Sequence, residues 1–328
     1  MSSDKYNFTV FGYEIDYFRY MFADVIAQPN GEYISDPVKD FCPSGLLRGL
    51  YTLHSNRYLN WKCRLPFQDF WHRYSFRDTY GDERPKCFVF LMRWLKPENE
   101  YLFAKLRRCY PACKIVVYLE DLVKTGKNSL DFTIAERYAD LIVSYDRADA
   151  ETYGFLYYPT FLSRPVLRPD AAIVASDICF CGAAKERYPV IMDCYRRLTE
   201  LGYRCDFSVS RLSSDMPRYA GIRYIKRLIP YGEYLQHVLK TKCILELMQD
   251  DATGYTLRTW EAILFDKILL TNNKAILSAP FYNPQQFIYF GDVGELKNGF
   301  LREGRPCNDY ADKLSPKLFL DFIATNLN

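Results

Sequence analysis

The chain has 328 residues, of which 49% are hydrophobic and 25% are charged, so it can build sizeable cores and is not a disordered protein. At about 100–200 residues per domain, this length predicts two domains. The net charge of +3 leaves no strong electrostatic footprint for a duplex, so we expect no nucleic-acid partner. The aromatic share of 17% favours surfaces that stack on planar or ring-shaped ligands.

The eleven cysteines are scattered and include no Cys-x-x-Cys pair. Several, such as Cys87 and Cys243, lie within apolar runs, where cysteine acts as a small buried hydrophobe. This pattern fits neither a small disulfide scaffold nor a zinc site. The first seven residues are polar, and no run of about 18 apolar residues occurs, so we expect no secretory leader and no membrane span. A reduced, cytoplasmic protein is therefore expected.

Strands and helices alternate through the first half of the chain. Residues 8–12 predict a first strand, whereas residues 16–71 are aromatic and irregular and support no assignment beyond turns at proline and glycine. The continuous apolar run at 87–91 predicts a strand buried on both faces, and further strands are expected at 114–119 and 141–144. Helices are expected at 98–109 and around Ala135 and Tyr138. Such alternation is typical of a parallel, doubly wound sheet.

The second half repeats the alternation after a proline-containing linker at about residues 158–176. Strands are expected at 177–181, 205–209, 222–225, 243–247, 267–271 and 287–290, and helices at 189–201, 231–239, 256–265 and 316–327. We therefore predict an α/β protein with two doubly wound, Rossmann-like domains facing a cleft. The expected boundaries are 1–165 and 166–310, with a C-terminal helix in 311–328 that packs back on the first domain.

A candidate phosphate site follows the strand predicted at 243–247. A loop containing Gly254 leads into a helix that begins near Thr256, and a helix N-terminus presents free N–H groups and partial positive charge. Thr256 adds a hydroxyl and Arg258 a cation, and the Glu261 carboxylate can accept two ribose hydroxyls. The alternative is that Thr256 only caps the helix, Arg258 is solvated and Glu261 pairs with a lysine.

Residues 253–262, Thr-Gly-Tyr-Thr-Leu-Arg-Thr-Trp-Glu-Ala, together with 267–273, resemble the donor-site block of GT-B glycosyltransferases. The resemblance is closer to bacterial polysaccharide and lipopolysaccharide biosynthesis transferases and to CgeB-like transferase domains. Residues 281–284 and 178–182, the latter followed by Lys185, resemble the same group. The similarity spans about residues 177–290. Many retaining members carry two glutamates separated by seven residues; here Glu261 fills the second place and Thr253 occupies the first.

The resemblance implies a metal-independent, hexosyltransferase-type GT-B enzyme of bacterial surface polysaccharide synthesis. The donor, a UDP or GDP sugar, would bind the C-terminal domain, and a glycan or lipid-linked acceptor would bind the N-terminal domain. Positive charge would stabilise the departing diphosphate. Arg187 is a weaker candidate for that charge, and solvated loop charges are the alternative for Lys185 and Arg187. The expected donor-site residues are Gly182, Lys185, Tyr231, Gly254, Tyr255, Thr256, Leu257, Arg258 and Glu261. For Tyr231, base stacking competes with a simple packing role at the start of its helix.

A catalytic base would come from a strand end of the N-terminal domain. Glu120 and Asp121, which directly follow the strand at 114–119, are the preferred candidates, ahead of Asp146 and Asp16. Each can instead be a helix N-cap. The three histidines, His54, His72 and His237, are interpreted as packed side chains. Residues 46–51 and 58–62 can provide peripheral membrane contact, and burial of an amphipathic segment is the alternative.

Motifs of other enzyme classes are missing. The sequence contains no P-loop, no Gly-x-Gly-x-x-Gly fingerprint after a strand and no Gly-x-Ser-x-Gly elbow. Two rivals to the transferase interpretation stay open. One is another nucleotide-sugar enzyme, such as an epimerase or a phosphorylase. The other is a non-catalytic module that kept the fold and binds sugar or a partner protein.

Overall fold

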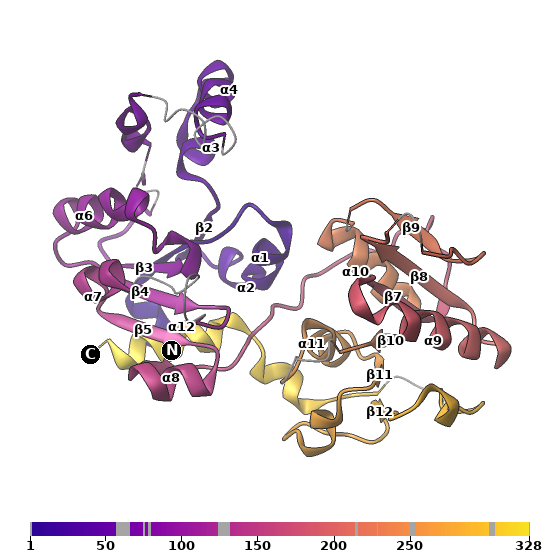
Figure 1. Ribbon diagram of the computed structural model, residues 1–328. Helices are drawn as coiled ribbons and strands as arrows, with labels where there is room; N and C mark the ends of the chain where they lie inside the picture. The colour runs from indigo at the N-terminus through magenta and orange to yellow at the C-terminus, as the bar shows by residue number, and fades with distance from the viewer. Residues whose placement is uncertain are drawn as a thin grey trace. The chain divides into compact units, whose positions relative to one another are not determined.

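The computed structural model describes residues 2–56, 66–74, 76–77, 80–123, 132–213, 216–227, 229–248, 254–301 and 306–327. The chain divides into two compact units (Figure 1). Unit 1 comprises Met1–Ser163 and Ser315–Asn328, and unit 2 comprises Arg164–Leu314. The chain therefore leaves unit 1, builds unit 2 and returns to unit 1 for its last helix.

Unit 1 contains a six-stranded parallel sheet in the order β2-β1-β3-β4-β5-β6. Its strands are β1 (Asn7–Phe11), β2 (Gly31–Ile34), β3 (Lys86–Leu91), β4 (Lys114–Leu119), β5 (Leu141–Ser144) and β6 (Leu156–Tyr157). The central strands β1, β3 and β4 are buried almost throughout, as expected when helices cover both faces of a parallel sheet.

Several helices of unit 1 begin at side-chain caps. Asp36 caps α3 by accepting from the amides of Val38 and Lys39, Ser44 caps α4, and Asp146 caps α8. The helices are α1 (Asp16–Met21), α2 (Ala23–Ile26), α3 (Pro37–Phe41), α4 (Gly45–His54), α6 (Glu100–Cys109), α7 (Thr133–Tyr138), α8 (Arg147–Tyr153) and α12 (Pro316–Asn326).

Aromatic side chains fill the core of unit 1. Phe90 stacks on Phe11, with ring centroids 4.5 Å apart, and on Phe103 of α6. On α12, which is yellow in Figure 1, the buried Phe319 stacks on Phe161 and contacts Tyr118. These contacts make the last helix part of the unit 1 core.

Unit 2 contains a second six-stranded parallel sheet, in the order β12-β11-β10-β7-β8-β9. Helix α9 packs on one face, and α10 and α11 pack on strands β7, β10 and β11. The strands are β7 (Ser176–Ala183), β8 (Cys205–Ser210), β9 (Arg223–Ile225), β10 (Thr241–Glu246), β11 (Ile268–Thr271) and β12 (Phe287–Tyr289). The helices are α9 (Tyr188–Glu200), α10 (Tyr231–Lys240) and α11 (Leu257–Leu264).

The predicted fold class is confirmed: both units are parallel α/β sheets of the doubly wound kind. Every predicted strand is present, with ends that shift by a few residues. The sequence left 16–71 unassigned, and in the described part of this stretch, 16–56 and 66–71, the structure has β2, the helices α1 to α4 and the start of a 3₁₀ helix, η2 (Gln68–Arg73). The ten cysteines within the described ranges are free thiols. No helix in the described part of the chain has the length and apolarity to cross a membrane.

Candidate functional site

The candidate site lies at the carboxyl edge of the unit 2 sheet. Strands β7, β10 and β11 are parallel neighbours, so their carboxyl ends lie side by side. Ligands of open α/β sheets bind at this edge, beyond the ends of the strands. The loop after β10 leads to α11, whose first turn therefore lies at the same edge.

Glu246, the last residue of β10, holds this edge together. Its carboxylate is fully buried and accepts hydroxyl hydrogen bonds from Thr259 at 3.1 Å, from Thr271 at 2.6 Å and from Thr256. These hydroxyls come from α11, from β11 and from the N-cap of α11. The Glu246 carboxylate thus links β10 to the neighbouring strand β11 and to α11.

Thr256 is the N-cap of α11: its hydroxyl oxygen accepts from the Arg258 amide at 3.2 Å while its proton goes to Glu246. The Thr256 hydroxyl therefore caps α11, as the alternative interpretation held. Gly254 has a φ of +88°, a left-handed conformation that favours glycine, and its carbonyl accepts from the Asn273 side chain at 2.8 Å. The loop is thus tied to the end of β11.

Tyr255 and Leu257 flank the cap. The Tyr255 ring lies 4.9 Å from Phe281 and 5.6 Å from Trp260, so its side chain belongs to an aromatic cluster. Leu257 is partly buried. Their side chains support the conformation of the loop, and residues 249–253, which precede it, lie outside the described residues.

Two arginines converge beside this cap, and neither is a solvated surface charge. Arg258 donates to the Cys181 carbonyl of β7, and Arg187 donates to the carbonyls of Leu247 and, at 3.3 Å, Ala183. Their guanidinium carbons lie 6.0 and 5.9 Å from the centre of the Phe180 ring. Burial lowers the pKa of Arg187, and the nearby charge of Arg258 lowers it further.

Gly182 and Lys185 shape the turn after β7. A Cβ at Gly182 would lie 3.0 Å from the tip of the Phe180 ring and 3.2 Å from Arg187 Nη2, so glycine allows both to approach. Lys185 is exposed and has a left-handed φ of +44°. It opens the 3₁₀ helix η6 (Lys185–Arg187), which carries Arg187 to the edge.

Glu261 is fully buried one turn into α11. It accepts a hydrogen bond from the Tyr234 hydroxyl at 2.7 Å. Burial raises its pKa to about 7, although the Arg258 charge and the hydroxyls of Tyr234 and Tyr231 act in the opposite direction. Tyr231 is itself buried at the start of α10, and it faces this carboxyl group. The alternative interpretation paired Glu261 with a lysine; in the structure its neighbours are the Tyr234 hydroxyl and the Arg258 charge.

The arrangement can hold an anion. Arg187, Arg258 and Lys185 and the N-terminus of α11 place positive charge at the ends of β7 and β10. Each guanidinium has several N–H donors, so carbonyl contacts leave donors for phosphate oxygens. The cluster therefore has the chemistry to bind a diphosphate without a cation between protein and ligand.

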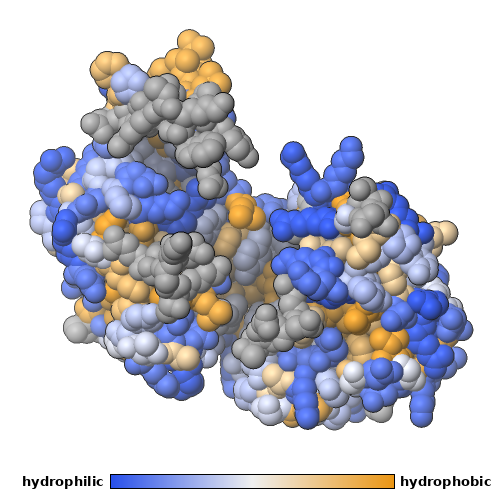
Figure 2. All heavy atoms as spheres, viewed as in Figure 1, coloured by the Kyte–Doolittle hydropathy of each residue, from blue (hydrophilic) through white to orange (hydrophobic). Residues whose placement is uncertain are grey.

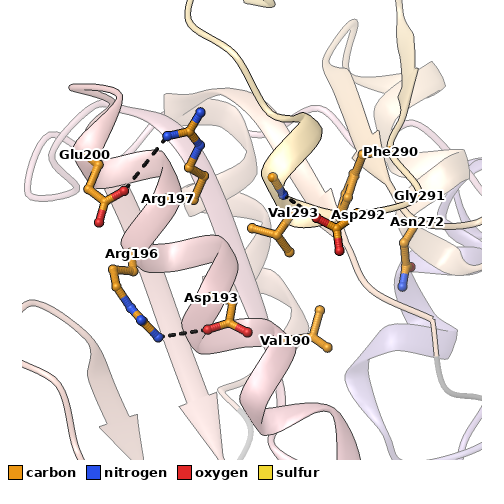
Figure 3. Close-up of a pocket in the computed structure, with 11 residues that line it drawn as sticks. Val190, Asp193, Arg196, Arg197, Glu200, Asn272, Phe290, Gly291, Asp292 and Val293 are labelled. Carbon is orange, nitrogen blue, oxygen red and sulfur yellow. Dashed lines mark hydrogen bonds and ion pairs between the residues drawn. The ribbon is translucent and has the colours of Figure 1, made fainter.

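A separate pocket of about 480 Å³ lies between α9 and the ends of β11 and β12 (Figure 3). Its two cations are already paired, Arg196 with Asp193 at 2.8 Å and Arg197 with Glu200 at 4.0 Å. Asp292 adds a further negative charge, so this lining is less suited to a diphosphate than the arginine cluster.

In unit 1, Glu120 lies at the carboxyl end of β4. It accepts from the Tyr13 hydroxyl and, at 2.9 Å, from the Met92 amide. Burial raises its pKa to about 7. Asp121 is exposed and accepts from the Leu122 amide at 2.9 Å. Glu120 therefore combines a strand-end position with a pKa suited to proton transfer near neutrality.

The other titratable candidates have structural partners. Asp146 caps α8, as the alternative interpretation held. His54 Nδ1 accepts from the Trp71 indole at 2.6 Å, His72 stacks on Tyr101, and His237 Nδ1 lies 2.5 Å from Asp206 Oδ2. Within the described residues, no group of three or more His, Cys, Asp or Glu side chains is arranged to hold a metal ion.

The predicted donor-site residues thus gather at one edge of one sheet. The sequence reasoning did not name Glu246 or Tyr234, and it treated Arg187, which lies beside Arg258 at this edge, as a weaker candidate than Lys185. A signal for Glu246 existed, because it is the one charged residue in the apolar run at 243–247. Nothing in the spacing pointed to Tyr234, which meets Glu261 only through the packing of α10 beside α11.

A scan against protein-family models gave no match, and a search of curated proteins gave none. Among solved structures, the spinosyn rhamnosyltransferase SpnG is 12% identical, with 98% of this chain and 95% of that chain aligned at a TM-score of 0.39. SnogD, a glycosyltransferase from Streptomyces nogalater, is 13% identical, with coverages of 98% and 92% and a TM-score of 0.39.

The Glycosylation Associate Protein (Gap123) complex from Streptococcus agalactiae matches 74% of this chain at 9% identity and a TM-score of 0.39. This chain spans 50% of the length of that chain. At such identities and TM-scores the matches assign neither a family nor an activity to this protein.

Proposed function

We propose that this protein is a glycosyltransferase that moves a sugar from a nucleotide-diphosphate sugar to a glycan or lipid-linked glycan. Unit 2 binds the donor, with UDP or GDP as its nucleotide, and unit 1 binds the acceptor. The setting is the synthesis of a bacterial surface polysaccharide, as the resemblance of residues 253–262 implies. The reaction uses no metal, because protein cations take over the charge of the leaving group.

The observation that carries this proposal is the convergence of Arg187 and Arg258 beside the N-terminus of α11. A departing nucleoside diphosphate develops negative charge, and fixed cations in a partly buried site stabilise it. Lys185 adds a mobile cation at the rim. Because the guanidinium groups are held by backbone carbonyls, little reorganisation is needed when the diphosphate forms.

Two carboxyl groups complete the proposed roles. Glu261 lies beside the cations and accepts hydrogen bonds from hydroxyl groups of the donor. These bonds replace the hydrogen bond that it accepts from Tyr234. Glu120 removes a proton from the acceptor hydroxyl, since its pKa of about 7 suits a base at neutral pH. Asp121 is its weaker alternative, because it is exposed.

Donor binding is tested by thermal shift with UDP, GDP, CMP and ADP. One nucleotide should raise Tm, since a ligand that binds only the folded state stabilises it. Arg258→Gln and Glu261→Gln should lose that rise while the far-UV circular dichroism stays native. Arg196→Gln, an exposed arginine on α9 paired with Asp193, is the matched control and should keep it. Retention of the full rise by Arg258→Gln would contradict the proposed site.

Catalysis is tested with the sugar derivative of the nucleotide that binds. Slow hydrolysis, or transfer to a glycan, supports the transferase. Conversion of the donor into an isomeric nucleotide sugar, with no release of the free nucleotide, would indicate an epimerase instead, and binding without turnover would indicate a non-catalytic module. Glu120→Gln should lower kcat about 100-fold or more and leave nucleotide binding unchanged, whereas Asp121→Asn should have a much smaller effect.

A further inference from the structure

Helix α4 of unit 1 presents a stripe of leucines to solvent. Leu46, Leu50 and Leu53 are spaced by four and three residues, which places them on one helix face, and they are 76%, 48% and 60% exposed. The opposite side of α4 packs through Leu47 and Tyr51 on a small cluster around Trp71. Within α4, Leu47 and Tyr51 are partly buried, as the alternative for residues 46–51 held, whereas the three leucines of the stripe stay in solvent.

The apolar surface continues from α4 onto η2. Trp71 of η2 contacts α4 through Tyr51, with ring centroids 5.2 Å apart. Phe67, which precedes η2, is 83% exposed, and Phe70 is 36% exposed. Figure 2 shows the hydrophobic colour gathered at this end of unit 1, over α4. We call Leu46, Leu50, Leu53, Phe67 and Phe70 the α4–η2 face. Several large exposed apolar side chains on two elements that pack together mark a candidate interaction site.

A basic groove adjoins η2. A pocket of about 450 Å³ is lined by His72 and Arg73 of η2 and by α6 residues that include Lys105 and Arg108, and its lining contains no acidic side chain. The Arg73 guanidinium lies 3.8 Å from the centre of the Phe70 ring, so cation and apolar surface are in direct contact. The side of the face formed by η2 and α6 is therefore positively charged.

The local sequence has the same bias. Residues 44–77 contain six lysines and arginines and one acidic residue, Asp69, for a net charge of +5. The whole chain has a net charge of +3, so all other residues together carry −2. The stretch of sequence that carries the exposed leucines and phenylalanines is thus rich in positive charge, a combination typical of helices that lie in the plane of an anionic lipid surface.

We propose that the α4–η2 face docks on an anionic phospholipid bilayer. The leucines and Phe67 enter the boundary between headgroups and acyl chains, and Arg73, Lys105 and Arg108 contact lipid phosphates. A second copy of this chain fits the face less well, because a two-fold dimer would bring two identical basic surfaces together. The inference goes beyond glycosyl transfer and does not depend on it.

The experiment is flotation of the full chain with vesicles of phosphatidylcholine alone and of phosphatidylcholine with about 30% phosphatidylglycerol. We expect binding to the anionic vesicles only, and at least a tenfold weaker partition when salt rises from about 0.1 to about 0.5 M. Leu46→Glu/Leu53→Glu should reduce the partition at least tenfold, as should Arg73→Gln/Arg108→Gln. Leu318→Glu, an exposed leucine of α12 in the same unit, should bind like the wild type.

Equal partition of the leucine double variant and the wild type would overturn the proposal, as would equal binding to neutral vesicles. A concentration-dependent dimer that Leu46→Glu/Leu53→Glu abolishes would assign the face to a second copy and also overturn it. Native circular dichroism and an unchanged Tm of the variants show that the fold is intact. Vesicle binding requires no nucleotide, so failure here is distinct from failure of the nucleotide thermal shift.

Discussion

Replacing Thr271 with valine should destabilise unit 2 by about 3 kcal/mol. The Thr271 hydroxyl donates to the Glu246 carboxylate at 2.6 Å in a fully buried position, and a hydrogen bond to a charged group contributes about 1.5–3 kcal/mol. The same hydroxyl oxygen accepts from the Asn273 amide at 2.9 Å, and a buried amide without an acceptor costs about 1–3 kcal/mol. Valine fills the same volume, so no cavity adds to the loss.

Thr259→Val is the internal comparison. Thr259 is equally buried, but its hydroxyl bond to Glu246 is 3.1 Å long and supports no further amide. Its loss should therefore cost about 1–1.5 kcal/mol, less than half the cost at Thr271. Glu200→Gln, an exposed position on α9, should lie within about 0.5 kcal/mol of the wild type.

The measurement is hydrogen exchange at increasing urea, followed by mass spectrometry on peptides that cover β10 and β11. This readout reports unit 2 separately, which a single unfolding curve of a two-unit chain does not. A Thr271→Val loss below about 0.5 kcal/mol, or a larger loss for Thr259→Val, would refute the role assigned to Glu246.

Three further outcomes are expected. The pKa of Glu261 is about 7 in the folded state against an ordinary 4.5, so the folded state binds this proton more tightly than the unfolded state does. The stability of unit 2 should therefore fall by about 3 kcal/mol as pH rises from 4.5 to 7. Glu261→Gln should flatten the resulting slope of Tm against pH, and a profile parallel to that of the wild type would contradict this expectation. Arg187→Gln should weaken binding of inorganic pyrophosphate, measured by calorimetry, about 10- to 100-fold, with Arg196→Gln unchanged; equal affinities would remove Arg187 from the site. Gly182→Ala should cost about 1–3 kcal/mol in chemical denaturation because its Cβ meets Phe180 and Arg187, and a neutral result would show that the contact relaxes freely.

The sheet strands were predictable because they are buried on both faces. Runs such as 87–91, 115–119 and 243–245 are continuously apolar, and a chain with that pattern has few alternatives to a central parallel strand. Residues 16–71 could not be assigned because burial there does not follow such an apolar pattern. Their helices are short, and α4 has its leucines in solvent, so apolar periodicity there does not report burial.

Only those features of the site that depend on residues close together in the sequence could be predicted. Thr256 as a cap and Gly254 in a left-handed turn follow from the residues themselves. The convergence of Arg187 and Arg258 depends on contacts across 60 and 77 positions, made to backbone carbonyls that any residue could supply. Such contacts leave no trace in composition or spacing, so the proximity of the two arginines became visible only in three dimensions.

The return of the chain at Ser315 has a consequence for synthesis on the ribosome. Phe319, Leu320 and Ile323 of α12 are part of the interior of unit 1, and Ser315 binds Asp24 near the other end of the sequence. Unit 1, whose first strand is translated earliest, therefore cannot complete its core until α12 has been translated, whereas all of unit 2 is translated before α12. Nascent chains halted before residue 315 should hold a finished second lobe and an unfinished first one.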